Sequence, residues 1–214
     1  MTNPDQRIEA ENDALLRRLR GGDTPADEDG FARARSELAA RAARAGLVEV
    51  AFERHDTPLG AIVVAATAEG IVRIGLPSEP EDDVLDELAH RLSPRVLRSS
   101  PKTVERARRE IDEYFAGRRK RFAIPLDWRL TSGFRREVLR ATEQIPYGST
   151  SSYREVARDA GRPTAYRAAG TALATNPLPI LVPCHRVLPT GGGLGEYRGG
   201  TAAKARLLGL EGAV

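Results

Sequence analysis

The 214-residue chain has a single cysteine, Cys184, and a histidine follows it directly at position 185. An apolar run over residues 178–182 precedes this pair, and a glycine-rich segment over residues 191–195 follows it. Because the thiolate is the reactive form of cysteine, an imidazole that accepts the thiol proton would make the pair a nucleophile. The alternative is a small buried residue beside a solvated histidine, since free cysteine is among the most often buried residue types.

Other residues able to do chemistry are few. Glu211 falls at the C-terminal end of a helix predicted over residues 201–210, where a negative charge opposes the helix dipole and costs up to about 1 kcal/mol. A glutamate without any function is therefore disfavoured at this position. His55 and His90 are far from other candidate ligands, and we expect both at the surface. One cysteine excludes an intrachain disulfide framework and a multi-cysteine zinc site, so no metal and no cofactor is predicted.

The elements that must position Cys184 lie in a mostly helical C-terminal part. A helix capped by Ser132 should run through residue 144. A second should cover residues 152–160, and Thr164 should cap a third over residues 165–174, so that the last two form a helix-turn-helix. The helix predicted over residues 165–174 carries small side chains, and Arg167 is its only charged residue. Such a helix can approach a nucleic-acid groove closely, although a close helix–helix contact with Arg167 in solvent would need the same residues.

The preceding part of the chain reads as α/β. Strands are predicted over residues 48–52, 61–67 and 71–76, joined by tight turns into a small antiparallel sheet. Helices should follow over residues 80–92 and 104–115. The basic run 118–121 then reads as a linker. We therefore divide the chain into a helical extension of unknown role (1–46), an α/β domain with linker (47–121) and a helical domain with the helix-turn-helix (122–214).

Charge is distributed unevenly along the chain. Residues 1–116 carry 17 Lys and Arg against 23 Asp and Glu, whereas residues 117–214 carry 16 against 7. A basic C-terminal half suggests a polyanionic partner such as nucleic acid, although an arginine-rich solvated surface would look the same. No apolar run of membrane-spanning length and no secretory signal is evident, so we expect a cytoplasmic protein that does not contact membranes.

Taken together, these motifs closely resemble the O6-alkylguanine-DNA alkyltransferases, also called methylated-DNA–protein-cysteine methyltransferases. The resemblance covers roughly residues 48–212. It lies in residues 57–60, 145–148, Ser152-Tyr153, Arg167, Asn176-Pro177, and residues 183–187, 195–200 and 204–211. The extension 1–46 has no counterpart that we can name. The zinc-binding residues of some family members have no matching cysteine cluster here.

The resemblance implies a catalytic role for four residues. Cys184 would accept the alkyl group, and His185 would take the thiol proton through a bridging water. Glu211 would orient His185 and raise its basicity. The Tyr153 phenol would hydrogen-bond the leaving guanine, whose oxygen or ring nitrogen must gain a proton.

The resemblance also implies how DNA is bound. Arg167 would enter the duplex and replace the flipped nucleotide, with the second helix in the minor groove. The other DNA-binding residues implied are Ser152, Thr164 and Ala168. Asn176 would act as a hinge before the active-site strand, and the substrate pocket would be completed by Val187, Tyr197 and Arg198.

The function implied is DNA repair by direct reversal, an irreversible single-turnover transfer of the alkyl group from O6-methylguanine to Cys184. The partner would be double-stranded DNA containing O6-alkylguanine, bound by a monomer. Two alternatives remain. One is a non-catalytic alkyltransferase-like protein that only binds the lesion, against which the presence of Cys184 argues. The other is a Cys-His-Glu hydrolase, which would need oxyanion donors such as the backbone of residues 191–195.

Overall fold

The computed structural model describes residues 30, 34, 37, 41, 42 and 47–214. The chain divides into two units, residues 1–42 and residues 43–214, and each is considered by itself. The five described residues of the first unit are helical, in line with the helical extension expected over residues 1–46, and the rest of that extension lies outside the described residues.

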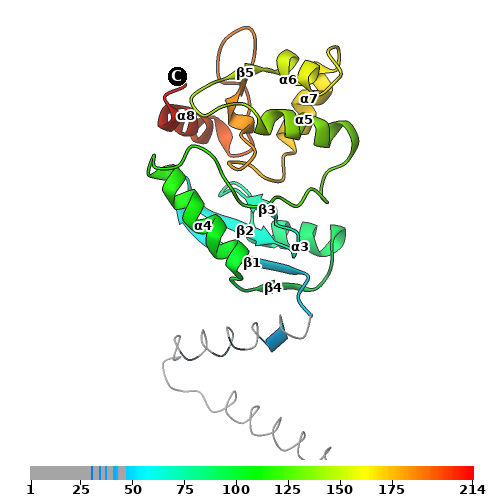
Figure 1. Cartoon of the computed structure of the whole chain (residues 1–214), viewed down its shortest axis with the longest axis vertical. Helices are drawn as coiled ribbons and strands as arrows, with labels where there is room; N and C mark the ends of the chain where they lie inside the picture. Colours follow the sequence, from blue (N-terminus) through cyan, green and yellow to red (C-terminus); the bar gives the residue numbers. More distant parts are fainter. Residues whose placement is uncertain (1–29, 31–33, 35–36, 38–40, 43–46) are drawn as a thin grey trace, which may run out of the picture. The chain divides into compact units, whose positions relative to one another are not determined.

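A four-stranded sheet forms the N-terminal half of the second unit, in the order β3-β2-β1-β4 (Figure 1). The strands are β1 (Val50–Thr57), β2 (Gly60–Ala66), β3 (Ile71–Gly75) and β4 (Val96–Arg98). The first three form the predicted antiparallel meander. Strand β4, which was not predicted, pairs parallel to β1 and makes the sheet mixed. Three residues are too few to show an alternating pattern, and β4 is held by the free edge of β1.

The two faces of the sheet are covered by different helices. On β2, Ile62 and Val64 face the cluster that contains α4 (Lys102–Phe115), whereas Val63 and Ala65 face the cluster that contains α3 (Glu81–Arg91). Successive side chains of a strand point to opposite faces, so an unbroken apolar strand requires a cover on each side. Both helices begin and end within two residues of the predicted bounds.

The C-terminal half is helical, as predicted (Figure 1). Its elements are α5 (Gly133–Glu143), β5 (Ser151–Ser152), α6 (Tyr153–Asp159), α7 (Tyr166–Ala174), a 3₁₀ turn η1 (Cys184–Arg186), β6 (Val187–Leu188) and α8 (Gly200–Glu211). Helices α5, α6 and α7 pack against one another, and β5 pairs parallel with β6. This short pairing brings the start of α6 beside the residues that follow the cysteine.

The helix caps agree only in part with the prediction. Ser152 caps α6 in a capping box: its hydroxyl accepts from the Glu155 amide at 3.2 Å, and the Glu155 carboxylate accepts from the Ser152 amide at 2.7 Å. Ser132 occupies the N-cap position of α5 without a side-chain hydrogen bond. The predicted cap at Thr164 is wrong, because α7 begins one residue later and has Ala165 at its N-cap.

One hydrophobic cluster runs through both halves, from Ile62 and Ile74 in the sheet to Leu139 and Leu207 in the helices. The backbone joins them as well, since the Ile74 amide donates to the Pro177 carbonyl at 2.8 Å. The segment that leads to Cys184 is therefore hydrogen-bonded to the sheet. Among the described helices, none is long and apolar enough to cross a membrane.

His55 corrects the expectation of a surface residue. The residue is 7% exposed, and its side chain extends from β1 toward α4, with Nε2 2.8 Å from an Asp112 oxygen and Nδ1 3.2 Å from the Arg108 Nε donor. Its two partners come from a helix 53 or more residues further along the chain, so no local pattern indicated the burial. His90 is exposed, as expected.

Candidate active site

Cys184 begins the 3₁₀ turn η1, and its side chain is only 7% exposed. Asn176, just beyond the end of α7, holds the Cys184 side chain by a hydrogen bond. The Asn176 Nδ2 donates to Sγ at 3.1 Å and to the Val182 carbonyl at 3.0 Å, while its Oδ1 accepts from the Leu178 amide at 2.9 Å. One buried amide thus ties the thiol to both ends of the apolar segment. Asn176 is not the C-cap of α7, a position that Thr175 occupies.

The thiol is protonated at rest. Burial raises the pKa of Cys184, and the Asn176 hydrogen bond and the nearby Lys204 charge only partly offset this effect. The Lys204 ammonium is itself buried and donates to the Val187 carbonyl at 2.7 Å. A reaction at this sulfur therefore requires a neighbouring base that removes the proton as the new bond forms.

His185 has the features of that base. Its side chain is fully buried, and Nε2 lies 2.9 Å from an oxygen of Glu211. Burial lowers the pKa of His185, the effect of Glu211 acting in the opposite direction, so the ring is neutral near pH 7. With the proton on Nε2, directed at Glu211, Nδ1 is an acceptor, and it has no hydrogen-bond partner among the described residues.

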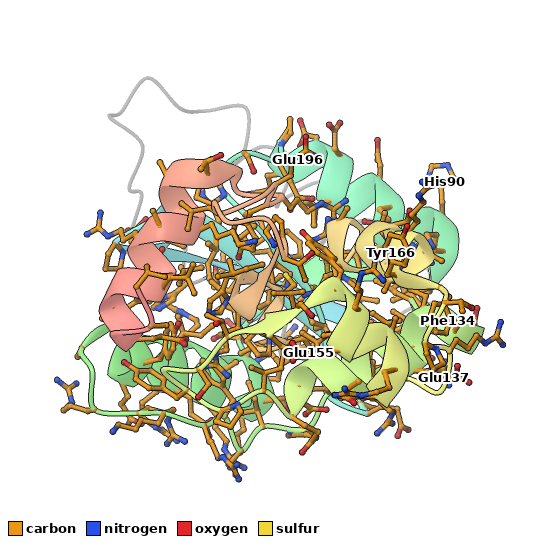
Figure 2. All side chains as sticks on the ribbon, turned by 90° about the horizontal axis from the view of Figure 1, so that it is seen from above. His90, Phe134, Glu137, Glu155, Tyr166 and Glu196 are labelled. Atoms are coloured by element: carbon orange, nitrogen blue, oxygen red, sulfur yellow. The ribbon has the colours of Figure 1, made fainter. Side chains whose placement is uncertain are left out.

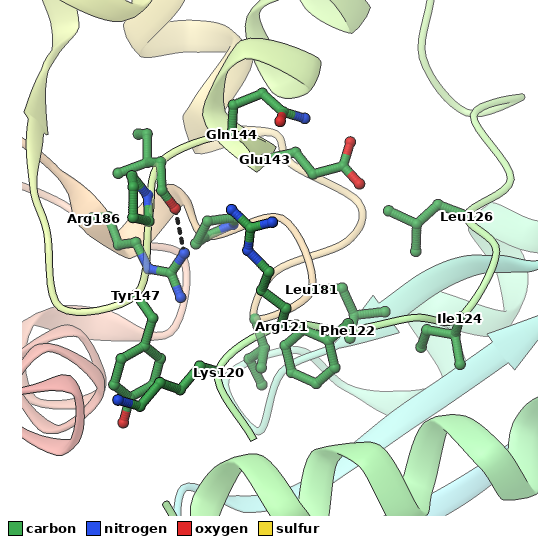
Figure 3. A pocket seen from close by; sticks show the side chains of 14 residues that line it. Lys120, Arg121, Phe122, Ile124, Leu126, Glu143, Gln144, Tyr147, Leu181 and Arg186 are labelled. Atoms are coloured by element: carbon green, nitrogen blue, oxygen red, sulfur yellow. Dashed lines mark hydrogen bonds between the residues drawn. The ribbon is translucent and has the colours of Figure 1, made fainter. Parts of the chain in front are cut away.

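Glu211 is held ionised by several donors. Burial opposes its charge, but the hydrogen bonds from His185 and Arg186 bring the pKa of Glu211 down to about 2. Arg186 makes a bidentate pair with it at 2.8 and 2.9 Å, and the Tyr114 hydroxyl donates to it at 2.6 Å. Arg186 also donates to the Ile145 carbonyl at 2.6 Å (Figure 3). These donors offset the unfavourable position of a carboxylate at a helix C-terminus.

Arg186 and Tyr114 had no role predicted from the sequence. Arg186 stands in the same short motif as Cys184 and His185, so its position indicated that it belongs to the site. The motif did not indicate that its partner is Glu211. Tyr114 lies on α4, 97 residues before Glu211, and burial raises its pKa so that it remains a hydroxyl donor. No local sequence signal indicates a contact over that distance.

A pocket of about 520 Å³ opens beside the sulfur. Its walls come from α6, α7, η1 and the loop before α8. The lining residues are Tyr153, Gly170, Thr171, Leu173, Ala174, Cys184, Pro189, Gly195, Glu196, Tyr197 and Arg198. The pocket is large enough for a purine base, and its aromatic walls suit a flat ring.

Two phenols and a guanidinium face this pocket with different surroundings. Burial and the neighbouring Cys184 raise the pKa of Tyr153, so its hydroxyl stays a donor at neutral pH. The Tyr197 hydroxyl is buried and has no partner among the described residues, and its ring stands edge-on to that of His185 at 6.4 Å. The Arg198 guanidinium lies 3.3 Å from Glu79 in the N-terminal half and 3.4 Å from the Asn176 carbonyl.

The remaining predicted residues lie elsewhere. Val187 is fully buried in β6 and pairs with Ser151, so it supports the pocket without lining it. Ser152 caps α6, and Thr164 is exposed in the turn before α7. Arg167 and Ala168 lie on the exposed face of α7 with Thr171 and Ala174, whereas Ala169, Ala172 and Leu173 are buried. The exposed face is thus narrow and carries one charge.

The fold and site define a protein in which a cysteine nucleophile, with a His–Glu pair behind it, lies in a pocket beside two short helices joined by a turn. Two family models match the chain. The model described as the ribonuclease-like domain of 6-O-methylguanine DNA methyltransferase covers residues 46–128, and the DNA binding domain of the same family covers residues 133–213. The chain belongs to the 6-O-methylguanine DNA methyltransferase family.

Individual relatives agree. The inducible methylated-DNA–protein-cysteine methyltransferase of Bacillus subtilis is 38% identical over 69% of this chain and 82% of its own length. The constitutive one of the same organism is 38% identical over 75% of this chain and 94% of its own. Among solved structures, Mycobacterium tuberculosis O6-methylguanine methyltransferase is 33% identical with a TM-score of 0.65, and it covers 77% of this chain and 93% of its own. The complex of Mycobacterium tuberculosis OGT with DNA is 32% identical with a TM-score of 0.66, covering 76% and 93%.

Proposed function

We propose that the chain is a methylated-DNA–protein-cysteine methyltransferase, which repairs O6-methylguanine in DNA by moving the methyl group to Cys184. The observation that carries the proposal is the sulfur in the wall of a purine-sized pocket with the buried His185–Glu211 pair behind it. Membership of the family supports it. The same site explains why a cysteine that is protonated at rest can still act as a nucleophile.

The transfer is a single displacement. The thiol proton leaves toward Nδ1 of His185 through a bridging water, and Glu211 stabilises the imidazolium that forms. The sulfur forms a bond to the methyl carbon while the bond from that carbon to O6 breaks, and the electron pair of the broken bond stays on guanine. A hydrogen bond from the Tyr153 phenol stabilises the negative charge that develops there.

The reaction ends after one turnover. The product is a thioether, and no group in the pocket activates a water against an S-alkyl carbon. The chain has no second cysteine that could receive the methyl group. The alternative of a Cys-His-Glu hydrolase requires repeated turnover, so the stoichiometry of the reaction separates the two.

DNA is bound through α6 and α7 acting as a helix-turn-helix. The narrow exposed face of α7 enters the minor groove, where bulky side chains would not fit. Arg167 takes the place of the flipped nucleotide, because a methyl group on a stacked base cannot reach a buried sulfur. Ser152, Thr164 and Ala168 contact the DNA backbone near Arg167. Asn176 acts as the hinge to the active-site turn, and Tyr197 and Arg198 with Val187 behind them hold the guanine.

Residues 122–214 form the DNA-binding and catalytic domain in this proposal, and residues 47–121 form the α/β domain that supports it. Tyr114 and Glu79 exert that support directly, through Glu211 and Arg198. The protein acts on double-stranded DNA as a monomer in the cytoplasm, and it needs neither metal nor cofactor for the displacement described.

The test is a titration of a fixed amount of protein with an excess of duplex containing O6-methylguanine, followed by peptide mass mapping. We expect one methyl group per protein, on the peptide that contains Cys184. The Cys184→Ser variant should transfer none and still bind the duplex, because an alkoxide is far harder to form than a thiolate at neutral pH. Repair beyond one equivalent, or a methyl group on another residue, would overturn the assignment.

A further inference from the structure

Helix α7, whose sequence is YRAAGTALA, begins with Tyr166, its one aromatic residue. Tyr166 is labelled in Figure 2. Its ring is only partly buried and packs against the hydrophobic cluster. A tyrosine in the first turn widens a helix face that is narrow everywhere else. The proposed minor-groove contact gives no reason for a bulky ring at this position, so the ring calls for a separate explanation.

Two guanidinium groups lie over the Tyr166 ring. Arg154 of α6 is 4.7 Å from the ring centroid, and Arg167 is 5.9 Å from it. Neither has a carboxylate within ion-pair distance among the described residues, whereas the neighbouring Arg158 is paired with Asp159 at 3.1 Å. The ring and its two uncompensated cations form a surface suited to a flat, anionic ligand.

This surface borders a second pocket of about 340 Å³. Tyr166 and Arg154 are among its lining residues. Three further lining residues, Tyr153, Gly170 and Pro189, also line the pocket beside Cys184. A Cβ added at Gly170 would lie 3.7 Å from the Tyr153 ring, so the two pockets adjoin at the wall that Gly170 and Tyr153 form.

We propose that the second pocket is a nucleotide subsite, which takes the nucleotide adjacent to the alkylated one on the same DNA strand. The inference rests on the proposed function. A base flipped into the first pocket must stay joined through a phosphodiester to a neighbour, and the adjoining pocket lies where that neighbour emerges. Its base stacks on the Tyr166 ring in place of the Arg154 guanidinium, which moves off the ring and pairs with the phosphate. Because stacking does not read base edges, this subsite accepts any base.

The experiment compares Tyr166→Ala with Tyr166→Phe, which keeps the ring. Each variant and the wild type react with three duplexes. In the first, called fully based, every nucleotide carries its base. In the other two, the nucleotide on the 5′ side or the one on the 3′ side of O6-methylguanine is abasic. The second-order rate constant of methyl transfer is measured. Reaction with a free O6-alkylguanine base, together with the thermal midpoint, reports whether the folded Cys184 centre is intact.

We expect Tyr166→Ala to lower the rate on the fully based duplex about tenfold or more, in keeping with the loss of one stacked base. Tyr166→Phe should stay within about twofold of the wild type. On the duplex that is abasic at the occupied side, the effect of Tyr166→Ala should shrink to about twofold or less, because the stacking partner is then missing from both reactions.

An unchanged rate for Tyr166→Ala on the fully based duplex would overturn the subsite, as would an equal loss on all three duplexes. The latter would mean that the ring only positions Arg167 or α7. Failure of the wild type to transfer a methyl group from any duplex would instead contradict the proposed function. The two failures are therefore distinguished within one set of reactions.

Discussion

Asn176 sets the reactivity of the sulfur, because it is the side chain that donates to Sγ at 3.1 Å. Asn176→Asp keeps the shape, removes the donor and places a carboxyl group against the sulfur, so the pKa of Cys184 should rise further. We expect transfer from a free O6-alkylguanine base to slow about tenfold or more at pH 7 and to recover in part at higher pH.

The control for this variant is Thr175→Ala, which removes the neighbouring hydroxyl that bonds to the Thr171 carbonyl at 2.9 Å. It should react like the wild type. Equal rates for Asn176→Asp and the wild type across the pH range would show that the amide only supports the backbone. The measurement is the pseudo-first-order rate of Cys184 alkylation, followed by intact mass.

The buried His–Glu pair should also make stability depend on pH. Glu211 has a pKa of about 2 in the folded protein against an ordinary value of 4.5, so its contribution is present above pH 4.5 and is lost as the pH falls toward 2. That contribution amounts to about 3 kcal/mol. His185, whose pKa is lowered by burial, acts in the same direction, because its protonation below pH 6.5 favours the unfolded chain.

Urea unfolding at a series of pH values between 7 and 3.5 checks this expectation. The free energy of unfolding should fall steadily with decreasing pH, with the His185 contribution first and the Glu211 contribution last. A free energy that is constant or rises over this range would contradict the buried ion arrangement. The imidazole carbon resonances of His185 provide an independent measure, since the ring should remain neutral at pH 6.5.

At the residue scale, what the sequence could predict depended on distance along the chain. Cys184, His185 and Arg186 are consecutive, and the motif they form pointed to the site directly. Glu211 was found because a carboxylate at a helix C-terminus is unfavourable without a partner. Tyr114 and the buried position of His55 were missed, because each depends on packing between segments more than 50 residues apart.

At the scale of elements, helix α7 presents Arg167 on a face of small residues. Arg167→Ala should slow repair of duplex DNA by about ten- to several-hundredfold, because the variant must meet an unstacking cost of a few kcal/mol without a substitute in the stack. Reaction with a free O6-alkylguanine base should change less than about twofold, since that substrate needs no flipping.

The control is Arg206→Ala, which removes an exposed arginine from α8 and the same unit of charge. It should leave the ratio of the two rates unchanged. An equal loss on duplex and free base for Arg167→Ala would mean that Arg167 supports the Cys184 pocket. Single-turnover rates measured at matched protein concentration, with both substrates, decide between these outcomes.

The elements themselves were largely predictable, because hydrophobic periodicity extends over most of each one. The helices from α3 to α8 and the three strands of the meander were placed within a few residues. The largest difference is at β1, which was predicted to end at residue 52 and continues to Thr57. Strand β4 and the N-cap of α7 were not. Each depends on a few residues whose conformation is selected by a neighbouring segment, namely the edge of β1 and the turn at residues 162–165.

At the scale of the whole molecule, the remaining question concerns residues 1–46. Every side chain that the proposed reaction uses lies between Glu79 and Glu211, within the unit of residues 43–214, and a single hydrophobic cluster joins its two halves. The extension carries 8 Lys and Arg against 9 Asp and Glu, so its removal changes the net charge by one unit. It therefore contributes little to attraction toward phosphates.

We accordingly expect a protein that begins at residue 47 to keep the thermal midpoint of the full chain within a few degrees. It should transfer methyl groups from duplex DNA at the same rate, within about twofold. Its affinity for DNA should fall with salt as steeply as that of the full chain, because the same phosphate contacts release the same counterions. A shallower salt dependence for the shortened protein would place residues 1–46 on the DNA. A normal thermal midpoint with lost repair would place them in the site, and the division of the chain proposed above would then be wrong.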